Sequence, residues 1–187
     1  MNDVEPSTRR VFFALLPDQN THHALAQAIA PIIKANHPRL RWLSSESWHL
    51  TLRFVGNVTN HQLEGLTECV EQIAGNHSQV DLNLLQIEPF PSRRRPVVLA
   101  ATGDSTPSAC LLVAGLEHAC RDLGLPAEHR GWRCHLTLAR VRGRSAIDIG
   151  STTLNVALRS RELLLMETVV QDRQSQYVPV ARGFLNE

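Results

Sequence analysis

The tetrapeptide His49-Leu50-Thr51-Leu52 occurs a second time in the chain as His135-Leu136-Thr137-Leu138. Each copy alternates polar and apolar residues, so as a β-strand it would direct the histidine and threonine to one face and both leucines to the other. The polar face suits chemistry, and the leucine face suits a hydrophobic core. The copies are too far apart in sequence for one hairpin, so a fold that uses both must bring two parts of the chain to one cleft.

The similarity between the two copies extends beyond four residues. Arg53-Phe54-Val55-Gly56 follows the first copy and Ala139-Arg140-Val141-Arg142-Gly143 follows the second, so each is followed by a basic residue and a glycine turn signal. A single copy would more often be a half-exposed strand face than a catalytic site, because short motifs arise by chance. Two extended copies favour a function that both share.

The rest of the chain alternates strand and helix patterns. Besides the two motif strands, apolar and β-branched runs predict strands at 11–16, 41–43, 80–84, 97–102, 154–158, 162–170 and 176–181. Apolar stripes between capping residues and stop signals predict helices at 18–36, 60–74 and 106–124. This order predicts an α+β protein with helices packed outside antiparallel sheets. Because no linker or low-complexity tract interrupts the pattern, we expect a single domain over residues 1–187.

The composition is that of an ordinary globular protein, with 43% hydrophobic and 20% charged residues. The net charge of +1 provides no long-range attraction for nucleic acid, so such a contact would need a local basic patch. Lys34 is the only lysine among 19 basic residues. The arginine excess suits phosphate recognition, but genomic base composition explains it equally well.

Cysteine spacing and the amino terminus bear on the compartment. The four cysteines form no Cys-x-x-Cys pair and no zinc-site spacing, so we expect reduced, mostly buried thiols and a cytoplasmic protein. Arg9-Arg10 resembles an export signal, but the apolar run that follows ends at Pro17, which favours a first strand. No apolar run approaches the length of a membrane span. We expect no membrane association, no obligate protein partner and a monomer.

With these motifs, the chain resembles the 2H phosphoesterase superfamily and, within it, the RNA 2′,3′-cyclic phosphodiesterases, also called 2′-5′ RNA ligases. The resemblance is carried by residues 10–15, 48–56, 90–96 and 135–140. It departs from the family at two places. A tryptophan usually follows the basic segment, but here Val97-Val98-Leu99 leads to Ala100, and prolines usually precede the second motif, where this chain has Gly131 and Cys134. It implies a bilobal, pseudo-symmetric fold, with two antiparallel sheets and outer helices around a central cleft.

The same resemblance implies an activity and the roles of the two histidines. The expected substrates are RNA ends or nucleotides bearing a 2′,3′-cyclic phosphate, hydrolysed to 2′-phosphomonoesters, with 2′-5′ ligation as the reverse reaction. Motif order implies that His49 is the proton donor and His135 the proton acceptor, without a metal or cofactor. Imidazoles titrate near neutral pH and suit both roles. The hydroxyls of Thr51 and Thr137 can donate to non-bridging phosphate oxygens and hold the group in line.

Arginines near the motifs are candidate phosphate contacts. Arg130 and Arg140 are predicted to bind substrate, and the exposed loop at 89–96, which holds three consecutive arginines, is a further candidate, although such a run is more often simply solvated. Strand parity places Arg53 on the face of His49, and Phe54 and Arg140 on the leucine faces unless a bulge turns them. Phe54 is therefore predicted in the core.

Three alternatives stay open from sequence. Another 2H enzyme could act on 2′-5′ oligonucleotides or RNA 3′ ends with the same two histidines. A two-histidine metal hydrolase would need further ligands, for which Glu46, Glu128 and His129 are the nearest residues. A non-enzymatic RNA-binding module would normally carry more stacking side chains than an aromatic content of 5% provides.

Overall fold

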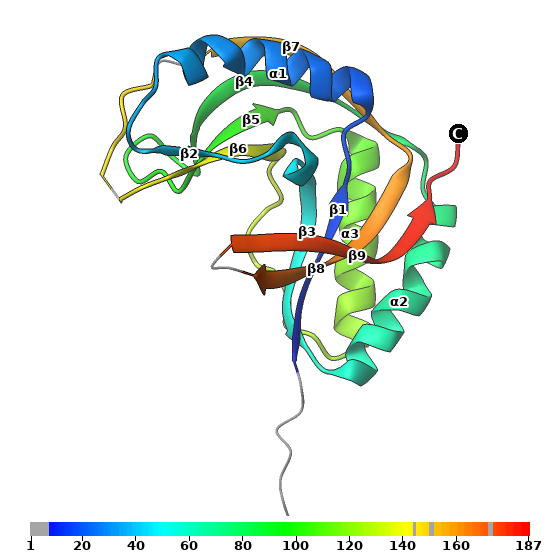
Figure 1. Cartoon of the computed structure of the whole chain (residues 1–187). Helices are drawn as coiled ribbons and strands as arrows, with labels where there is room; N and C mark the ends of the chain where they lie inside the picture. The colour runs from blue at the N-terminus through cyan, green and yellow to red at the C-terminus, as the bar shows by residue number, and fades with distance from the viewer. Residues whose placement is uncertain (1–7, 144, 150–151, 172–173) are drawn as a thin grey trace, which may run out of the picture.

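Nine strands form one strongly curved antiparallel sheet in the order β7-β4-β5-β6-β3-β1-β8-β9, with β2 also paired to β6 (Figure 1). The computed structural model describes residues 8–143, 145–149, 152–171 and 174–187. The strands are β1 (Arg9–Leu15), β2 (Leu40–Trp42), β3 (Leu50–Val58), β4 (Val80–Phe90), β5 (Val98–Gly103), β6 (His135–Val141), β7 (Thr152–Ser160), β8 (Glu162–Gln171) and β9 (Gln174–Phe184). The helices are α1 (Gln19–Lys34), α2 (Asn60–Gly75) and α3 (Pro107–Asp122).

The sheet has two halves that meet at one residue pair. We call β7, β4, β5, β6 and β2 the β4 half-sheet, and β3, β1, β8 and β9 the β1 half-sheet. Leu50 of β3 opposite Leu136 of β6 is the pair that joins them. The α+β prediction with outer helices is confirmed, and the two expected antiparallel sheets are joined edge to edge at this pair.

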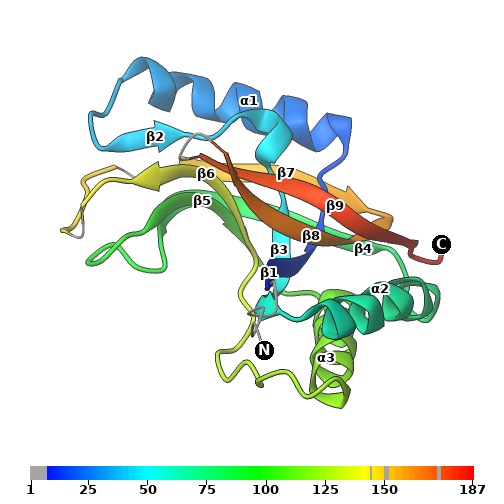
Figure 2. The same ribbon diagram turned by 60° about the horizontal axis from the view of Figure 1, so that its bottom comes forward.

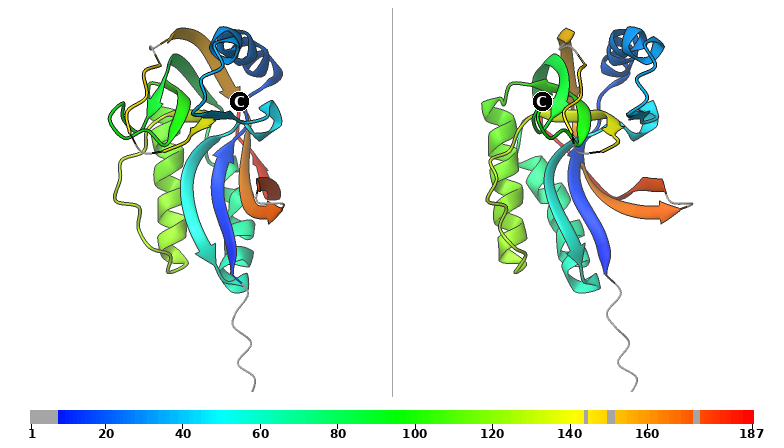
Figure 3. Two further views of the ribbon diagram at one scale, coloured as in Figure 1. Left: turned by 60° about the vertical axis from the view of Figure 1, so that its left-hand side comes forward. Right: turned by 90° about the vertical axis from the view of Figure 1, so that its left-hand side faces the viewer.

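Helices cover the two half-sheets from different sides. Helix α1 lies along the β4 half-sheet, whereas α2 and α3 lie together beside the β1 half-sheet (Figures 2 and 3). Each helix begins at a side-chain cap, in which Asp18, Thr59 and Thr106 accept a hydrogen bond from a backbone N–H in the first turn. None of the helices that the structure describes is long and apolar enough to cross a membrane.

The two faces of the β1 half-sheet bury different clusters. The main hydrophobic core includes Phe13 and Leu15 of β1, together with apolar side chains of all three helices. Phe12 and Ala14 point to the opposite face and form a small second cluster with Leu164 and Met166. Strand β1 is thus buried on both faces, as its uninterrupted apolar sequence predicts. The second cluster lies on the face that carries the first motif histidine.

Two local predictions are wrong or incomplete. The glycine turn signal at 56 does not end the first motif strand: β3 continues to Val58, and Gly56 adopts a φ of 92° beside a register shift. A glycine in a left-handed conformation is typical of a bulge as well as of a turn. All four cysteines are free as expected, but Cys110 is exposed and Cys69 only half-buried.

Candidate active site

The two motifs lie side by side across the junction of the half-sheets. Because β3 and β6 are antiparallel and Leu50 is opposite Leu136, His49 lies opposite Thr137, and Thr51 lies opposite His135. Residues opposite each other in a ladder share a face, and diagonal neighbours in a regular ladder are roughly 7–8 Å apart. The register therefore gathers both histidines and both threonines on one face, related by a local two-fold axis. The fold brings together the four residues that the repeat singled out.

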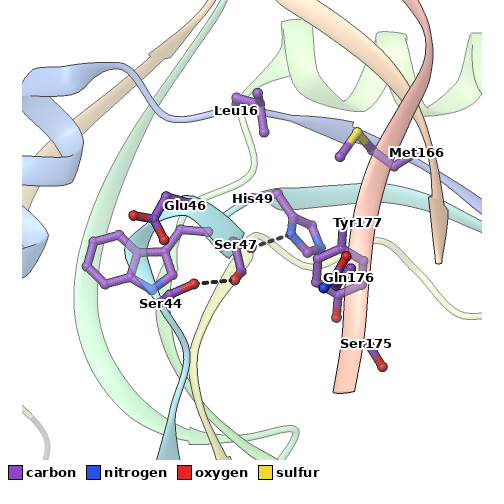
Figure 4. Close-up of a pocket in the computed structure, with 10 residues that line it drawn as sticks. Leu16, Ser44, Glu46, Ser47, His49, Met166, Ser175, Gln176 and Tyr177 are labelled. Atoms are coloured by element: carbon purple, nitrogen blue, oxygen red, sulfur yellow. Dashed lines mark hydrogen bonds between the residues drawn. The ribbon is translucent and has the colours of Figure 1, made fainter. Parts of the chain in front are cut away.

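Each histidine side chain is hydrogen-bonded to the backbone carbonyl of the residue two positions before it. Nδ1 of His49 lies 2.8 Å from the carbonyl oxygen of Ser47, and Nδ1 of His135 lies 2.9 Å from that of Arg133. A carbonyl oxygen only accepts, so each Nδ1 must carry a proton and donate it. This fixes the tautomer of each neutral ring and leaves Nε2 as the nitrogen that gains or loses a proton. Figure 4 shows the contact between His49 and Ser47.

Aromatic rings pack against both imidazoles. Phe12 lies 5.0 Å from the His49 ring, centroid to centroid, and Tyr177 meets the same ring edge-on at 4.8 Å. Phe90 stacks on His135 at 4.3 Å and 10°. These contacts restrict ring rotation and exclude water from one side of each histidine. The sequence prediction missed all three residues, because they lie on strands distant from the motifs and no local pattern links them.

Burial changes the proton affinity of both rings. It lowers the pKa of His49 below its ordinary value, the bond to Ser47 raises it, and the charge that His135 can carry lowers it. Burial likewise lowers the pKa of His135. The hydrogen bond to the Arg133 carbonyl raises this pKa, and the positive charge of the Arg133 guanidinium lowers it. Both imidazoles are therefore biased towards the neutral form.

A bulge in each motif strand reverses part of the parity prediction. Thr51 pairs with Ala14 and Arg53 with Phe13, so Leu52 is the extra residue, and Leu138 is the extra residue of β6 in the same way. Beyond a bulge, the alternation of faces changes phase. The prediction that Arg53 shares the face of His49 is wrong, as is the prediction that Phe54 lies in the core.

The side chains after the bulges have distinct environments. Arg53 is only 5% exposed and binds Glu117 of α3 at 2.6 Å, whereas Phe54 is 39% exposed and lies over Phe12. Arg140, the counterpart of Phe54 in β6, is exposed, and its Nη2 donates to the hydroxyl of Tyr177 at 3.3 Å. The bulge therefore turns Arg140 to the motif face, as its predicted role in binding requires.

Two cavities open beside the motifs. The larger, of about 560 Å³, is lined by Thr51, Thr137 and His135 and by the apolar side chains of Phe90, Val98 and Trp132. The smaller, of about 330 Å³, is lined by His49 and Tyr177 together with polar residues such as Ser44 and Gln176 (Figure 4). One histidine thus faces each cavity.

The loop between α3 and β6 lies over the larger cavity and is anchored to the first motif strand. Nη2 of Arg53 donates to the carbonyl of Pro126 at 2.5 Å, and the backbone N–H of Glu128 donates to Glu117 at 3.2 Å. At its other end, Nε1 of Trp132 donates to the carbonyl of Thr51 at 2.9 Å. The loop that precedes the second motif is therefore positioned by the first.

Arg130 lines the larger cavity but is 86% exposed and bound to Glu128 in a bidentate ion pair. That guanidinium lowers the pKa of the Glu128 carboxyl to about 2. A phosphate would have to compete with Glu128 for Arg130. Arg133, which the sequence prediction did not select, lies 4.5 Å above the Phe90 ring and has no carboxylate partner within the described ranges.

Among the residues that the structure describes, the carboxylates that the metal-hydrolase alternative requires do not gather at the motifs. Across the part of the chain that the structure describes, no group of three or more histidine, cysteine, aspartate or glutamate side chains is arranged to hold a metal ion. Glu46 lines the cavity beside His49, whereas Glu128 binds Arg130.

Comparison with known proteins finds similarity to one family over part of the chain. A family model described as LigT like phosphoesterase matches residues 16–100, which include the first motif. A Bacillus subtilis protein named RNA 2′,3′-cyclic phosphodiesterase is 27% identical in an alignment that covers 67% of this chain and 74% of that protein. An Aeropyrum pernix protein of the same name is 27% identical over 104 residues, but these are 56% of this chain and only 58% of the relative.

Solved structures share the fold at low sequence identity. Escherichia coli LigT in complex with 3′-AMP has a TM-score of 0.76 and 21% identity, and the alignment covers 97% of this chain and all of that one. A Thermus thermophilus protein has a TM-score of 0.83 and 19% identity over 94% and 97% of the two chains. The sequence match and the curated relatives agree with the paired motifs, and the chain is similar to the LigT like phosphoesterases over residues 16–100.

Proposed function

We propose that the protein hydrolyses 2′,3′-cyclic phosphates at RNA ends by acid–base catalysis between His49 and His135. The observation that carries this proposal is the Leu50–Leu136 register, which places each histidine opposite the threonine of the other motif. The names of the Bacillus subtilis and Aeropyrum pernix relatives support the same substrate class.

The proposed reaction is an in-line displacement at phosphorus. Nε2 of neutral His135 takes a proton from water as the water oxygen attacks phosphorus. The bond from phosphorus to the ribose 3′ oxygen breaks, and Nε2 of protonated His49 gives its proton to that oxygen. The product is a 2′-phosphomonoester. The same displacement with an RNA 5′-hydroxyl in place of water, in which the bond to the 3′ oxygen again breaks, would form a 2′-5′ bond. Hydroxyls of Thr51 and Thr137 donate to the non-bridging oxygens, which carry the charge of the transition state.

Charge supports the division of roles. The Arg133 guanidinium disfavours a proton on His135, as a general base requires. Burial lowers the pKa of His49, and a bound phosphate would raise it again by bringing negative charge beside the ring, so substrate binding favours the protonated acid. The larger cavity has the volume of a small-molecule site, and the 3′-AMP complex of the Escherichia coli relative supports a nucleotide ligand.

Product analysis tests this function. Purified protein is incubated with nucleoside 2′,3′-cyclic phosphates and, separately, with 2′-5′-linked oligonucleotides, and the products are separated by chromatography. We expect 2′-phosphate from the cyclic substrates. A product that is only 3′-phosphate would reassign the leaving group, and turnover of only the 2′-5′ oligomers would favour the other 2H activity.

The proposed mechanism uses no metal, which gives a prediction of its own. Turnover of the cyclic nucleotide should be unchanged after incubation with excess EDTA, because both protons are moved by imidazoles. The matched sample receives EDTA already saturated with magnesium. Loss of activity that zinc or manganese restores would contradict this mechanism.

A further inference from the structure

Some exposed arginines are paired with carboxylates and others are not: Arg130 beside the larger cavity binds Glu128, whereas Arg121 of α3 has no carboxylate within 4.0 Å among the described residues. Several that lie away from the motif residues form ion pairs: Arg9 with Glu167, Arg159 with Asp81, Arg161 with Glu187 and Arg182 with Glu162. In contrast, within the described residues no carboxylate lies within 4.0 Å of the guanidinium of Arg41, Arg133, Arg140 or the three loop arginines at 93–95. These six residues, which we call the arginine track, all belong to the β4 half-sheet and its connecting loops.

Strand register aligns part of the track with the larger cavity. Phe90, Val98, Arg140 and Arg41 are successive partners across β4, β5, β6 and β2. Residues in such a row share a face of the sheet. Phe90 and Val98 line the larger cavity, so Arg140 and Arg41 continue the same row from that cavity to the sheet edge.

The pairing of Arg41 with Arg140 is unfavourable without an anion. The two residues lie directly opposite each other in the β2–β6 ladder, and both are exposed. Like charges in that position destabilise a sheet. A phosphate between or beside them would remove the repulsion and accept hydrogen bonds from both guanidinium groups.

The loop that joins β4 to β5 adds the other arginines of the track. It follows Phe90 directly, its residues 91–95 are exposed, and it protrudes at the end of the β4 half-sheet where β2 also lies (Figures 1 and 2). Arg133, two residues before the second motif histidine, donates to the carbonyl of Pro91 at 3.2 Å. Arg133 therefore links the cavity beside His135 to the start of the loop that carries the arginines at 93–95.

We propose that the arginine track binds the phosphates of a single-stranded RNA whose cyclic end occupies the motif site. The inference rests on the proposed function and extends it, because it makes a polynucleotide, and not a mononucleotide, the preferred substrate. The net charge of the chain is only +1, so this local row supplies attraction that the molecule as a whole lacks. Guanidinium groups match phosphate oxygens through two parallel hydrogen bonds, and backbone contacts of this kind read no sequence.

Substrate length and salt test the inference. The values of kcat/KM are measured for a nucleoside 2′,3′-cyclic phosphate and for an eight-nucleotide RNA that ends in the same cyclic nucleotide, over a range of NaCl concentrations. We expect the oligonucleotide to be preferred at low salt. The logarithm of its kcat/KM should fall with the logarithm of salt more steeply than that of the mononucleotide, by about 0.7 for each additional phosphate contacted.

Charge-removal variants locate the contact. Arg41→Gln and the triple variant Arg93→Gln/Arg94→Gln/Arg95→Gln should each reduce kcat/KM for the oligonucleotide by about two- to five-fold per arginine, the range for exposed ion pairs. Each lost contact should also reduce the salt slope by about 0.7. Arg159→Gln is the matched control, because it removes the same charge from the β7 edge of the same half-sheet. It should leave kcat/KM unchanged for both substrates. Melting temperatures verify that all variants fold.

The outcomes separate this inference from the proposed function. The inference is wrong and the function stands if the mononucleotide is hydrolysed but the oligonucleotide has no higher kcat/KM. The same holds if the oligonucleotide has a higher kcat/KM that the track variants retain. If neither is hydrolysed, the function fails, and fluorescence anisotropy with a 3′-hydroxyl oligonucleotide decides the inference alone. Salt-sensitive binding that the track variants lose would then support it, and binding that they retain would overturn it.

Discussion

The two motif imidazoles have different neighbours although their tetrapeptides are identical. His49 meets Tyr177 and Phe12, and His135 meets Phe90 with the Arg133 guanidinium above that ring. The sequence repeat could predict the pair of histidines but not their roles, since each copy carries the same chemistry. The neighbours that distinguish them come from β1, β4 and β9, whose side chains reach the site only through tertiary packing. The surroundings of each ring, and not the tetrapeptide, therefore decide which histidine acts as acid and which as base.

The lowered pKa values predict an acidic pH optimum for the free enzyme. Catalysis needs one imidazole protonated and the other neutral, and burial moves both pKa values below the ordinary one. The bell-shaped profile of kcat/KM should therefore have its maximum below about pH 6.5, the unperturbed imidazole value. The maximum of kcat should lie at higher pH, because bound phosphate raises the pKa of the acid. A kcat/KM maximum above about pH 8 would contradict this account of the free site.

Tyr177 is predicted to have two separable roles. Tyr177→Phe removes the acceptor of the Arg140 hydrogen bond but keeps the ring beside His49, so KM should rise about two- to ten-fold with an unchanged pH profile. Tyr177→Ala also exposes His49, whose pKa should rise because burial is the main cause of its lowered value. The alkaline limb, on which His49 loses the proton that it must donate, should therefore move to higher pH. Equal pH profiles for the two variants would show that the ring does not act on His49.

At the scale of elements, bulges explain where strand parity failed. Alternation predicts the faces of residues up to Thr51 and Thr137, and the structure agrees with it up to that point. A one-residue bulge then changes the phase, which buries Arg53 and brings Phe54 and Arg140 to the motif face. No turn or proline marks either bulge in the sequence. Their positions depend on pairing with β1 and β5, which local patterns do not contain.

Because the Arg53 guanidinium is buried and bonded, replacing Arg53 should lower the stability of the protein strongly. Arg53→Met removes the partner of Glu117 and the bond to Pro126, so the free energy of unfolding should fall. The loss should be near the lower end of about 3–5 kcal/mol, since Glu117 is 23% exposed and solvent screens its charge. Arg9→Met, which breaks the more exposed pair with Glu167, is the control and should cost less than about 1 kcal/mol. Similar losses in denaturant unfolding would contradict the anchoring role of Arg53.

At the scale of the whole molecule, much of the architecture was predictable. Helix positions followed from caps and apolar stripes, and the central strands from apolar runs. The junction of the two half-sheets was not predictable, because the pairing of Leu50 with Leu136 joins segments with two helices between them. That junction is what makes one site from two motifs. The central claim is therefore that His49 and His135 act together as acid and base.

The most direct test gives His49→Ala and His135→Ala two substrates, a nucleoside 2′,3′-cyclic phosphate and a p-nitrophenyl phosphodiester, whose leaving group needs no proton. With the cyclic phosphate, each variant should lose about 10²–10⁴-fold in kcat. With the aryl diester, we predict that His49→Ala recovers most of its activity and that His135→Ala does not. Recovery of His135→Ala alone would reverse the two roles, and unchanged kcat in both variants on the cyclic phosphate would contradict the two-histidine mechanism.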